Sequence, residues 1–140
     1  MQRVISNGVT VQGVVLIDTT TGLPYNAQGG AISGSVTTSK AKTTALASSL
    51  VVKASSGTLL GITGINTSDS DLYIQVHNTI SLPADASVPD LVFIAYAGQN
   101  FSLFLNVPYP LNTGIVVCNS TTLATKTIGS ANCWFNVQYT

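Results

Sequence analysis

The clearest structural signal in the sequence is the alternating segment Leu72-Tyr73-Ile74-Gln75-Val76-His77. Its aliphatic residues fall on one side of an extended chain, whereas its tyrosine, glutamine and histidine fall on the other. A period of two over this length predicts a β-strand that turns one face toward a hydrophobic core. No alternation of strands with helical patterns accompanies it, so a parallel sheet with crossover helices is not expected.

The same period recurs from residue 49 to the C-terminus. Further candidate strands are residues 51–53, 60–65, 91–96, 101–105, 115–118 and 133–139. In the last of these, Cys133, Phe135, Val137 and Tyr139 share one face. Turn-forming residues separate the candidates, as in residues 66–71 and 119–122. About eight short strands with frequent turns predict an all-β fold, a β-sandwich of jelly-roll type.

Residues 1–48 differ from the rest of the chain in composition. Apart from one apolar segment, residues 9–17, they are rich in Gly, Ala, Ser and Thr and contain little to bury. Such a composition does not offset the entropy of folding by itself. We therefore expect an extended N-terminal arm with one β segment over residues 1–48 and the jelly-roll sandwich over residues 49–140. The anchor residues expected in the arm are Val9, Val11, Val14 and Leu16.

The chain is almost uncharged. Charged residues make up 7% of the sequence, against about 25% in ordinary soluble domains. After Asp90 the only charged side chain is Lys126. Charged surfaces resist association, so a chain this neutral is expected to cover much of its outside with partners. We expect an oligomer.

Charge and hydropathy also exclude several classes of partner. The formal net charge is zero, and the five Lys and Arg residues are dispersed along the chain. Nucleic-acid binding through phosphate neutralisation is therefore not expected. The apolar run of residues 91–97 is far shorter than the roughly 18 residues of a membrane-spanning helix. The N-terminus has no apolar run typical of a secretory signal, so neither a membrane span nor secretion is expected.

Residues for catalysis or metal binding are few. The chain has one histidine, five aspartates and no glutamate. His77 is expected to be exposed or loosely hydrogen-bonded on the polar face of its strand. Asp69 and Asp71 lie in a Ser- and Asn-rich loop, which we interpret as a solvated turn because no ladder of calcium ligands follows. We expect no enzyme activity, no metal and no cofactor.

The two cysteines, Cys118 and Cys133, are too few for a metal site of about four ligands. The first interpretation is a pair of buried structural thiols. The alternative is one disulfide between them, if their segments pair as a hairpin around the turn-like residues 120–131. Assembly in the cytosol keeps thiols reduced and favours the first interpretation.

The aromatic residues admit two interpretations. The candidates for ligand or subunit contact are Tyr73, Tyr109 and Trp134, with Tyr96 and Phe104 beside them in the sequence pattern. Aromatic faces next to amide side chains are typical of sites that stack on sugar rings. Packing in the core or between subunits also accounts for them, because their period-two placement already fits strands.

Several segments share a further pattern. They are Leu50-Val51-Val52-Lys53-Ala54, Ser56-Gly57-Thr58-Leu59-Leu60-Gly61, Leu72-Tyr73-Ile74-Gln75-Val76-His77-Asn78, Pro89 ahead of Leu91, and Val137-Gln138-Tyr139 at the end. Together they resemble a jelly-roll virion module of tailed bacteriophages. Residues 15–25 are similar to short phrases common in phage structural proteins. The resemblance covers about two thirds of the chain, and neither the cysteines nor residues 108–110 have a place in it.

The resemblance implies a structural protein of a bacteriophage virion. Proteins of this kind sit on capsids as decoration knobs or in fibres and tail adaptors, commonly as homotrimers. We expect a capsid decoration, cement or head-fibre protein, made in the host cytoplasm and carried on the capsid surface. Its arm would dock onto the major capsid protein or another virion protein. The alternatives are a tail fibre or adaptor, and a receptor-binding module for host-surface carbohydrate with Trp134 as a platform.

Overall fold

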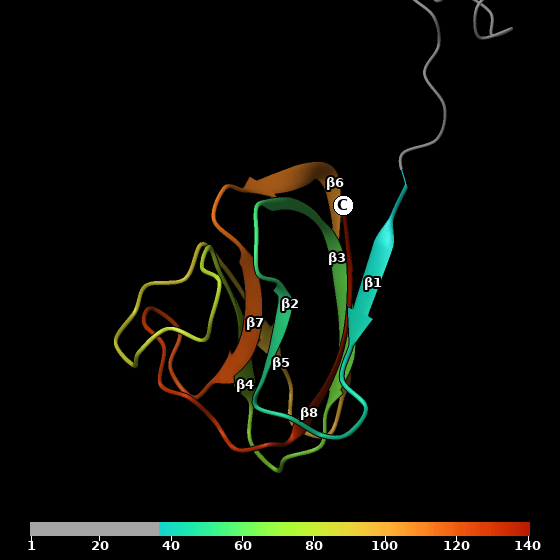
Figure 1. Cartoon of the computed structure of the whole chain (residues 1–140). Helices are drawn as coiled ribbons and strands as arrows, with labels where there is room; N and C mark the ends of the chain where they lie inside the picture. The colour runs from blue at the N-terminus through green and yellow to red at the C-terminus, as the bar shows by residue number, and fades with distance from the viewer. Residues whose placement is uncertain (1–36) are drawn as a thin grey trace, which may run out of the picture. The chain divides into compact units, whose positions relative to one another are not determined.

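The computed structural model describes residues 37–140, which form one compact unit. This part of the chain contains eight β-strands and no helix (Figure 1). The strands are β1 (Ser39–Lys42), β2 (Ser49–Lys53), β3 (Gly57–Asn66), β4 (Leu72–His77), β5 (Leu91–Ala95), β6 (Asn100–Leu111), β7 (Ile115–Ser120) and β8 (Cys133–Tyr139). Every segment expected to be a strand from residue 49 onward forms one.

The strands form two four-stranded sheets, one with the order β1-β8-β3-β6 and the other with the order β2-β7-β4-β5. All neighbouring strands run antiparallel. The two sheets face each other (Figure 1), and one hydrophobic core lies between them. The expected all-β class and the β-sandwich are therefore confirmed for residues 37–140.

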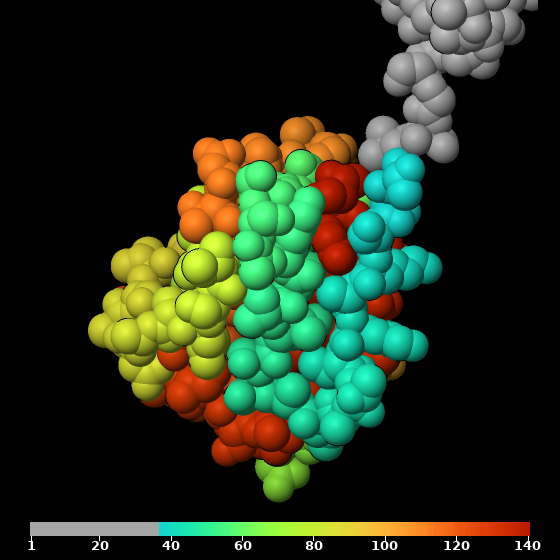
Figure 2. Space-filling model, in the orientation of Figure 1, coloured from blue at the N-terminus to red at the C-terminus, as the bar shows by residue number. Residues whose placement is uncertain are grey.

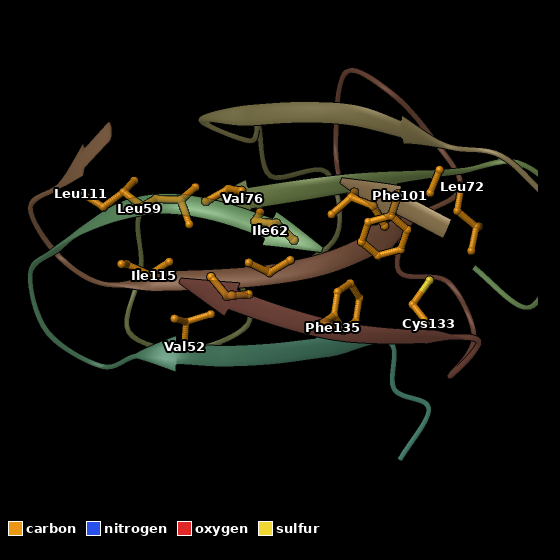
Figure 3. Packing of buried hydrophobic residues seen from close by; sticks show 14 residues of the cluster. Val52, Leu59, Ile62, Leu72, Val76, Phe101, Leu111, Ile115, Cys133 and Phe135 are labelled. Atoms are coloured by element: carbon orange, nitrogen blue, oxygen red, sulfur yellow. The ribbon is translucent and has the colours of Figure 1, made fainter. Parts of the chain in front are cut away.

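The core lies between the sheets and receives apolar side chains from seven of the strands (Figure 3). Its residues are Val52, Leu59, Ile62, Leu72, Ile74, Val76, Ala95, Phe101, Leu111, Ile115, Val117, Cys133, Phe135 and Val137. Three rings link the sheets: Phe101 contacts Phe93 at a centroid distance of 5.9 Å and Phe135 at 6.1 Å. Alternate residues of β4 and of β8 enter this core, as their sequence pattern predicts.

A buried asparagine holds one end of the sandwich together. Asn66, at the end of β3, has no exposed surface. Its amide nitrogen donates to the carbonyl oxygens of Ser70 and Ala95, each at 2.9 Å. Its amide oxygen accepts hydrogen bonds from the backbone nitrogen and the hydroxyl group of Ser68, at 3.0 and 2.7 Å. Because a buried amide is costly unless it is satisfied, these bonds fix the β3–β4 turn against the end of β5.

The boundary expected between residues 48 and 49 is wrong. The compact unit begins at Thr37, and β1 pairs with β8 from Ser39 opposite Tyr139 to Lys42 opposite Asn136. Figure 2 shows these first residues lying along the red C-terminal strand. The next turn is also held to β8, since Ala47 and Cys133 exchange backbone hydrogen bonds at 2.7 and 3.2 Å. Pairing with the edge of β8, rather than burial of large side chains, makes this polar segment a strand.

The outer face of the β2-β7-β4-β5 sheet is covered by two connections of the chain itself. They are residues 78–90, between β4 and β5, and residues 121–132, between β7 and β8 (Figure 1). Their backbones are joined by hydrogen bonds from Ala86 to Lys126, at 2.8 Å, and from Lys126 to Ser87, at 2.7 Å. We call these two connections the cover loops. Outward side chains of the two middle strands, such as Gln75 and His77 of β4 and Cys118 of β7, are consequently buried, whereas Val51 of β2 and Val92 and Ile94 of β5 are exposed.

Candidate functional site

A shallow groove lies on the other sheet, across β8, β3 and β6. Its volume is about 370 Å³, within the range of small-ligand sites. The lining residues are Thr63, Gly64, Ile65, Asn100, Phe101, Ser102 and Trp134. Within residues 37–140, no connection covers the outer face of this sheet as the cover loops cover the opposite sheet. We call this hollow the β3 groove.

The strand register explains the chemical make-up of the β3 groove. Ile65 of β3 stands opposite Trp134 on β8 and opposite Asn100 on β6. Two residues along β3, Thr63 stands opposite Asn136 and Ser102. Because residues two apart share a face, an aromatic row and a polar row lie next to each other on the outer surface.

A glycine lies beneath the β3 groove, at a position of β3 that faces the core between Phe101 and Phe135. A Cβ atom at Gly64 would lie 2.1 Å from the carbonyl oxygen of Trp134 and 2.4 Å from the ring of Phe101. No side chain other than hydrogen fits between this backbone and that ring. The close approach of β3, β8 and Phe101 at this point therefore requires glycine.

A second aromatic ring lies on the same outer face. Phe104 stands opposite Gly61, and a Cβ atom at Gly61 would lie 3.1 Å from the ring. Phe104 is nevertheless 65% exposed. It lies four residues along β3 from the row of Trp134 and Ile65, roughly 14 Å at the rise of an antiparallel strand. The polar row of Thr63 and its neighbours lies between the two rings.

None of the residues that line the β3 groove is charged. The cations on this side of the sheet are Lys40 and Lys42 of β1, which stand opposite Gln138 and Asn136 of β8. Both lysines are exposed and lie one strand beyond Trp134. The groove thus offers an aromatic face, hydroxyl groups and amides, without a fixed charge in its lining.

The residues under the cover loops form a second polar cluster, but a closed one. Gln75 has no exposed surface, and its amide donates to the carbonyl oxygens of Thr122 and Leu123 at 2.9 and 3.2 Å. Lys126 is 2% exposed and forms an ion pair with Asp85, whose side chain reaches solvent. The hydrogen bond from Lys126 holds the pKa of Asp85 below its usual value. This cluster fastens the cover loops to the sheet.

His77 belongs to this cluster; of the two expectations for it, exposure is wrong, whereas a loose hydrogen bond is present. It is 3% exposed, with its Nε2 3.3 Å from Oε1 of Gln75. Burial lowers the pKa of its imidazole, although Asp90 acts in the opposite direction. The histidine faces the polar side of β4 as its sequence position predicts. That side is buried because the cover loops close over it.

Nothing in the cluster resembles an activated nucleophile. Cys118 pairs with Gln75 across β7 and β4 and has no exposed surface. Burial raises the pKa of its thiol to about 11, so that the thiol is protonated at neutral pH. Between Thr37 and Thr140, no three His, Cys, Asp or Glu side chains gather as a metal site would need. The same residues include no helix of the length and hydropathy that crossing a membrane requires.

The two cysteines are separate, free and buried. Cys118 lies on β7 and Cys133 on β8, and these strands belong to different sheets. The hairpin on which the disulfide alternative depended is therefore absent. Cys133 packs in the core, where burial raises the pKa of its thiol. The interpretation as two buried structural thiols agrees with this arrangement.

The three aromatic residues singled out in the sequence do not form one site. Trp134 lines the β3 groove, whereas Tyr109 stands opposite Leu59 near the other end of β3 and packs against the core. Tyr73 belongs to the opposite sheet, where it stands between Ile94 and Ser120. The anchor residues Val9, Val11, Val14 and Leu16 lie outside the described residues.

Three polar or small residues of the β3 groove were not identified from the sequence: Thr63, Asn100 and Ser102. Their positions in strands were predicted, but the pairing of β3 with both β6 and β8 was not. The alternation around Phe101 does indicate that Asn100 and Ser102 share an outward face. Knowledge of the neighbouring strands is needed to place them beside Trp134.

Comparison with protein-family models, with curated proteins and with solved structures finds no match to this chain.

Proposed function

We propose that this chain is a structural, non-enzymatic protein of a bacteriophage virion, one that decorates or cements the capsid. The observation that carries the proposal is the combination of a nearly uncharged sequence with large apolar side chains on the surface of a rigid sandwich. Val107 is 79% exposed, Val88 74% and Phe104 65%. Burial of such apolar surface against partners lowers the free energy of the assembled protein.

The proposal includes a jelly-roll topology for the sandwich. The strand orders β1-β8-β3-β6 and β2-β7-β4-β5 are those expected when an eight-stranded chain folds as two Greek keys. Six of the seven connections along the chain pass from one sheet to the other, and only β4 and β5 follow each other within a sheet. This topology supports the resemblance to phage virion modules seen in the sequence.

The N-terminal residues supply the proposed link to the shell. The first described strand begins at Ser39, and residues 1–36, with Val9, Val11, Val14 and Leu16 among them, lie outside the described residues. An apolar segment that alternates in this way adds readily to the edge of a neighbouring sheet. We propose that it docks on the major capsid protein or on another virion protein, and that the chain assembles as a homotrimer.

The absence of enzyme activity in this proposal rests on the chemistry of the residues. The chain has a single histidine and no glutamate. That histidine is buried under the cover loops, and the thiol of Cys118 beside it has a pKa of about 11. General acid–base and nucleophilic catalysis both need groups that reach a substrate in their reactive protonation state.

The test is incorporation into particles of the phage that carries the gene. Deletion of residues 1–36 is expected to abolish incorporation while the sandwich stays folded, which circular dichroism of the purified truncated protein checks. A second variant replaces Val9, Val11, Val14 and Leu16 with alanine in the full chain. It keeps the length of the arm and is expected to lower incorporation. Normal incorporation of the truncated protein would remove the arm from the proposal.

The same sandwich suits a capsid role, a tail-fibre role and a tail-adaptor role. The location of the protein in the particle therefore distinguishes among the three. Immunogold labelling of intact virions is expected to mark the head. Labelling of the tail alone would contradict the capsid assignment, and absence of the protein from purified virions would contradict a virion function altogether.

A further inference from the structure

The β3 groove has the chemical features of a site for uncharged sugar rings. A pyranose ring presents C–H groups on its faces and hydroxyl groups around its edge. Trp134 offers an aromatic face for the former, and Asn100 and Ser102 offer an amide and a hydroxyl group for the latter. The groove is open and shallow, which suits a ring that lies flat against a sheet.

The polar groups beside Trp134 remain available to a ligand. On this face, the side-chain hydrogen bond formed between described residues joins Asn136 to Thr63, at 3.4 Å. Asn100 and Ser102 are exposed and direct their side chains to the same surface as Trp134. Hydrogen bonds to a bound sugar would therefore form without breaking the bonds that hold the sandwich together.

The arrangement of the two aromatic rings indicates more than one sugar. Trp134 lies on β8 and Phe104 on β6, with the row of Asn136, Thr63 and Ser102 between them. Gly61, opposite Phe104, adds no side chain to this strip. A polar strip with an aromatic ring at each end matches a short chain of linked rings better than a single ring.

The charges of this face select among sugars. The lining of the β3 groove contains no cation to pair with a carboxylate, and Lys40 and Lys42 lie on β1, one strand beyond Trp134. No acidic residue lines the groove either. A neutral ligand loses no ion–water contacts on entering such a site, whereas a charged one would lose them without compensation.

We propose that the β3 groove binds neutral hexopyranose units of a glycan chain, with Trp134 as the stacking platform and Asn100, Ser102 and Asn136 as hydrogen-bonding residues. This binding does not depend on the place of the protein in a virion. Virion incorporation and sugar binding are separate measurements, so either proposal stands if the other fails.

The experiment uses the full chain and its own fluorescence. Trp134 is the only tryptophan of the protein, so the indole emission reports on the β3 groove alone. The probes are maltohexaose, cellohexaose and the hexamer of N-acetylglucosamine, each titrated to millimolar concentration, followed by an array that holds neutral and sialylated glycans. We expect a saturable change in emission with at least one neutral glycan.

Variants then locate the site. Trp134→Ala is expected to weaken binding at least tenfold by calorimetry, and Asn100→Ala and Ser102→Ala by several-fold. The matched control is Tyr96→Ala, which removes an aromatic ring that is 59% exposed in the turn between β5 and β6, outside the lining of the groove, and is expected to leave binding unchanged. If Trp134→Ala fails to fold, Trp134→Phe retains a smaller platform and is expected to bind with intermediate affinity.

Three outcomes would overturn the proposal. The first is the absence of saturable binding by any neutral glycan. The second is binding of acidic glycans only, lost on Lys42→Gln and kept in Trp134→Ala. The third is a fall in molar mass on Trp134→Ala without any binding of sugar, which would make the groove a contact between subunits.

Discussion

At position 135 a phenylalanine ring without exposed surface packs in the core against Phe101 of β6, which in turn contacts Phe93 of the opposite sheet. Phe135→Ala leaves a cavity that the surrounding strands fill only in part. We expect a loss of about 3–5 kcal/mol in the free energy of unfolding, as other large core truncations show. Urea denaturation followed by circular dichroism measures it.

Phe104→Ala is the matched control for this change, because it removes the same ring from a site that is 65% exposed. We expect a loss within roughly 0.5 kcal/mol, the usual range for surface substitutions. Equal losses in the two variants would show that Phe135 does not occupy the core.

The burial of single residues was predictable from the sequence where the alternation of apolar and polar residues shows which face of a strand is turned toward the core. The inward side of β8 was identified from Cys133, Phe135 and Val137, all of which have no exposed surface. Asn66 was interpreted only as part of a turn, although its side chain is fully buried and makes bonds to both β3–β4 and β5 backbone. Its partners lie up to 30 residues away in the sequence, and periodicity contains no information on such contacts.

Among the elements, β1 is the one that a truncation tests most directly. Residues 37–140 retain β1 on the edge of β8, whereas residues 49–140 leave the backbone groups of β8 unpaired along residues 136–139. An open edge of this kind both destabilises a sheet and promotes pairing with other chains. We expect residues 37–140 to be monodisperse and residues 49–140 to unfold at lower temperature and to aggregate.

Calorimetry and size-exclusion chromatography of the two fragments measure these differences. Addition of a peptide with the sequence of residues 37–48 is expected to restore part of the stability of the shorter fragment. Identical behaviour of the two fragments would mean that β1 contributes nothing to the sandwich.

The burial of His77 under the cover loops predicts that the free energy of unfolding depends on pH. Burial lowers the pKa of His77 below 6.5 in the folded state, so that the unfolded chain binds more protons between that lowered value and 6.5. The free energy of unfolding is therefore expected to fall as the pH drops below about 6.5. The contribution of His77 to this fall ends below the pKa that His77 has in the folded protein. Asp85 also has a lowered pKa, but its effect begins only below 3.8.

Because His77 is the only histidine of the chain, the variant His77→Gln isolates its share. Denaturation at intervals between pH 7.5 and 5 is expected to give a nearly flat profile in the variant and a declining one in the unaltered protein. The reverse order, or the same slope in both, would contradict the burial of His77 beneath the cover loops.

The elements differ in how far the sequence predicts them. Seven strands follow from alternating apolar residues, but Ser39–Lys42 has a single apolar residue, Ala41, and becomes a strand by pairing with β8. The burial of His77 depends on the cover loops, which Lys126 and Asp85 join from two connections far apart in the sequence. The β3 groove likewise depends on strand order, so only its separate residues were predictable.

At the scale of the whole molecule, the uncharged surface predicts association in solution. We expect light scattering after size exclusion to give three times the 14.5 kDa mass of the chain. The same ratio for residues 37–140 would assign the contacts to the sandwich. A monomer in this fragment, beside a trimer of the full chain, would assign them to residues 1–36, and a monomer in both cases would contradict the trimer.

The burial of Lys126 also bears on how the protein meets digestive proteases. Trypsin cuts after Lys and Arg, and beyond Lys53 the chain offers it only Lys126, which is 2% exposed. Residues 54–140 thus present no accessible cleavage site while the cover loops stay closed, and cleavage must wait for local opening. We expect the folded chain to outlast typical lysine-rich proteins of its size in trypsin, losing at most the segments before residue 54.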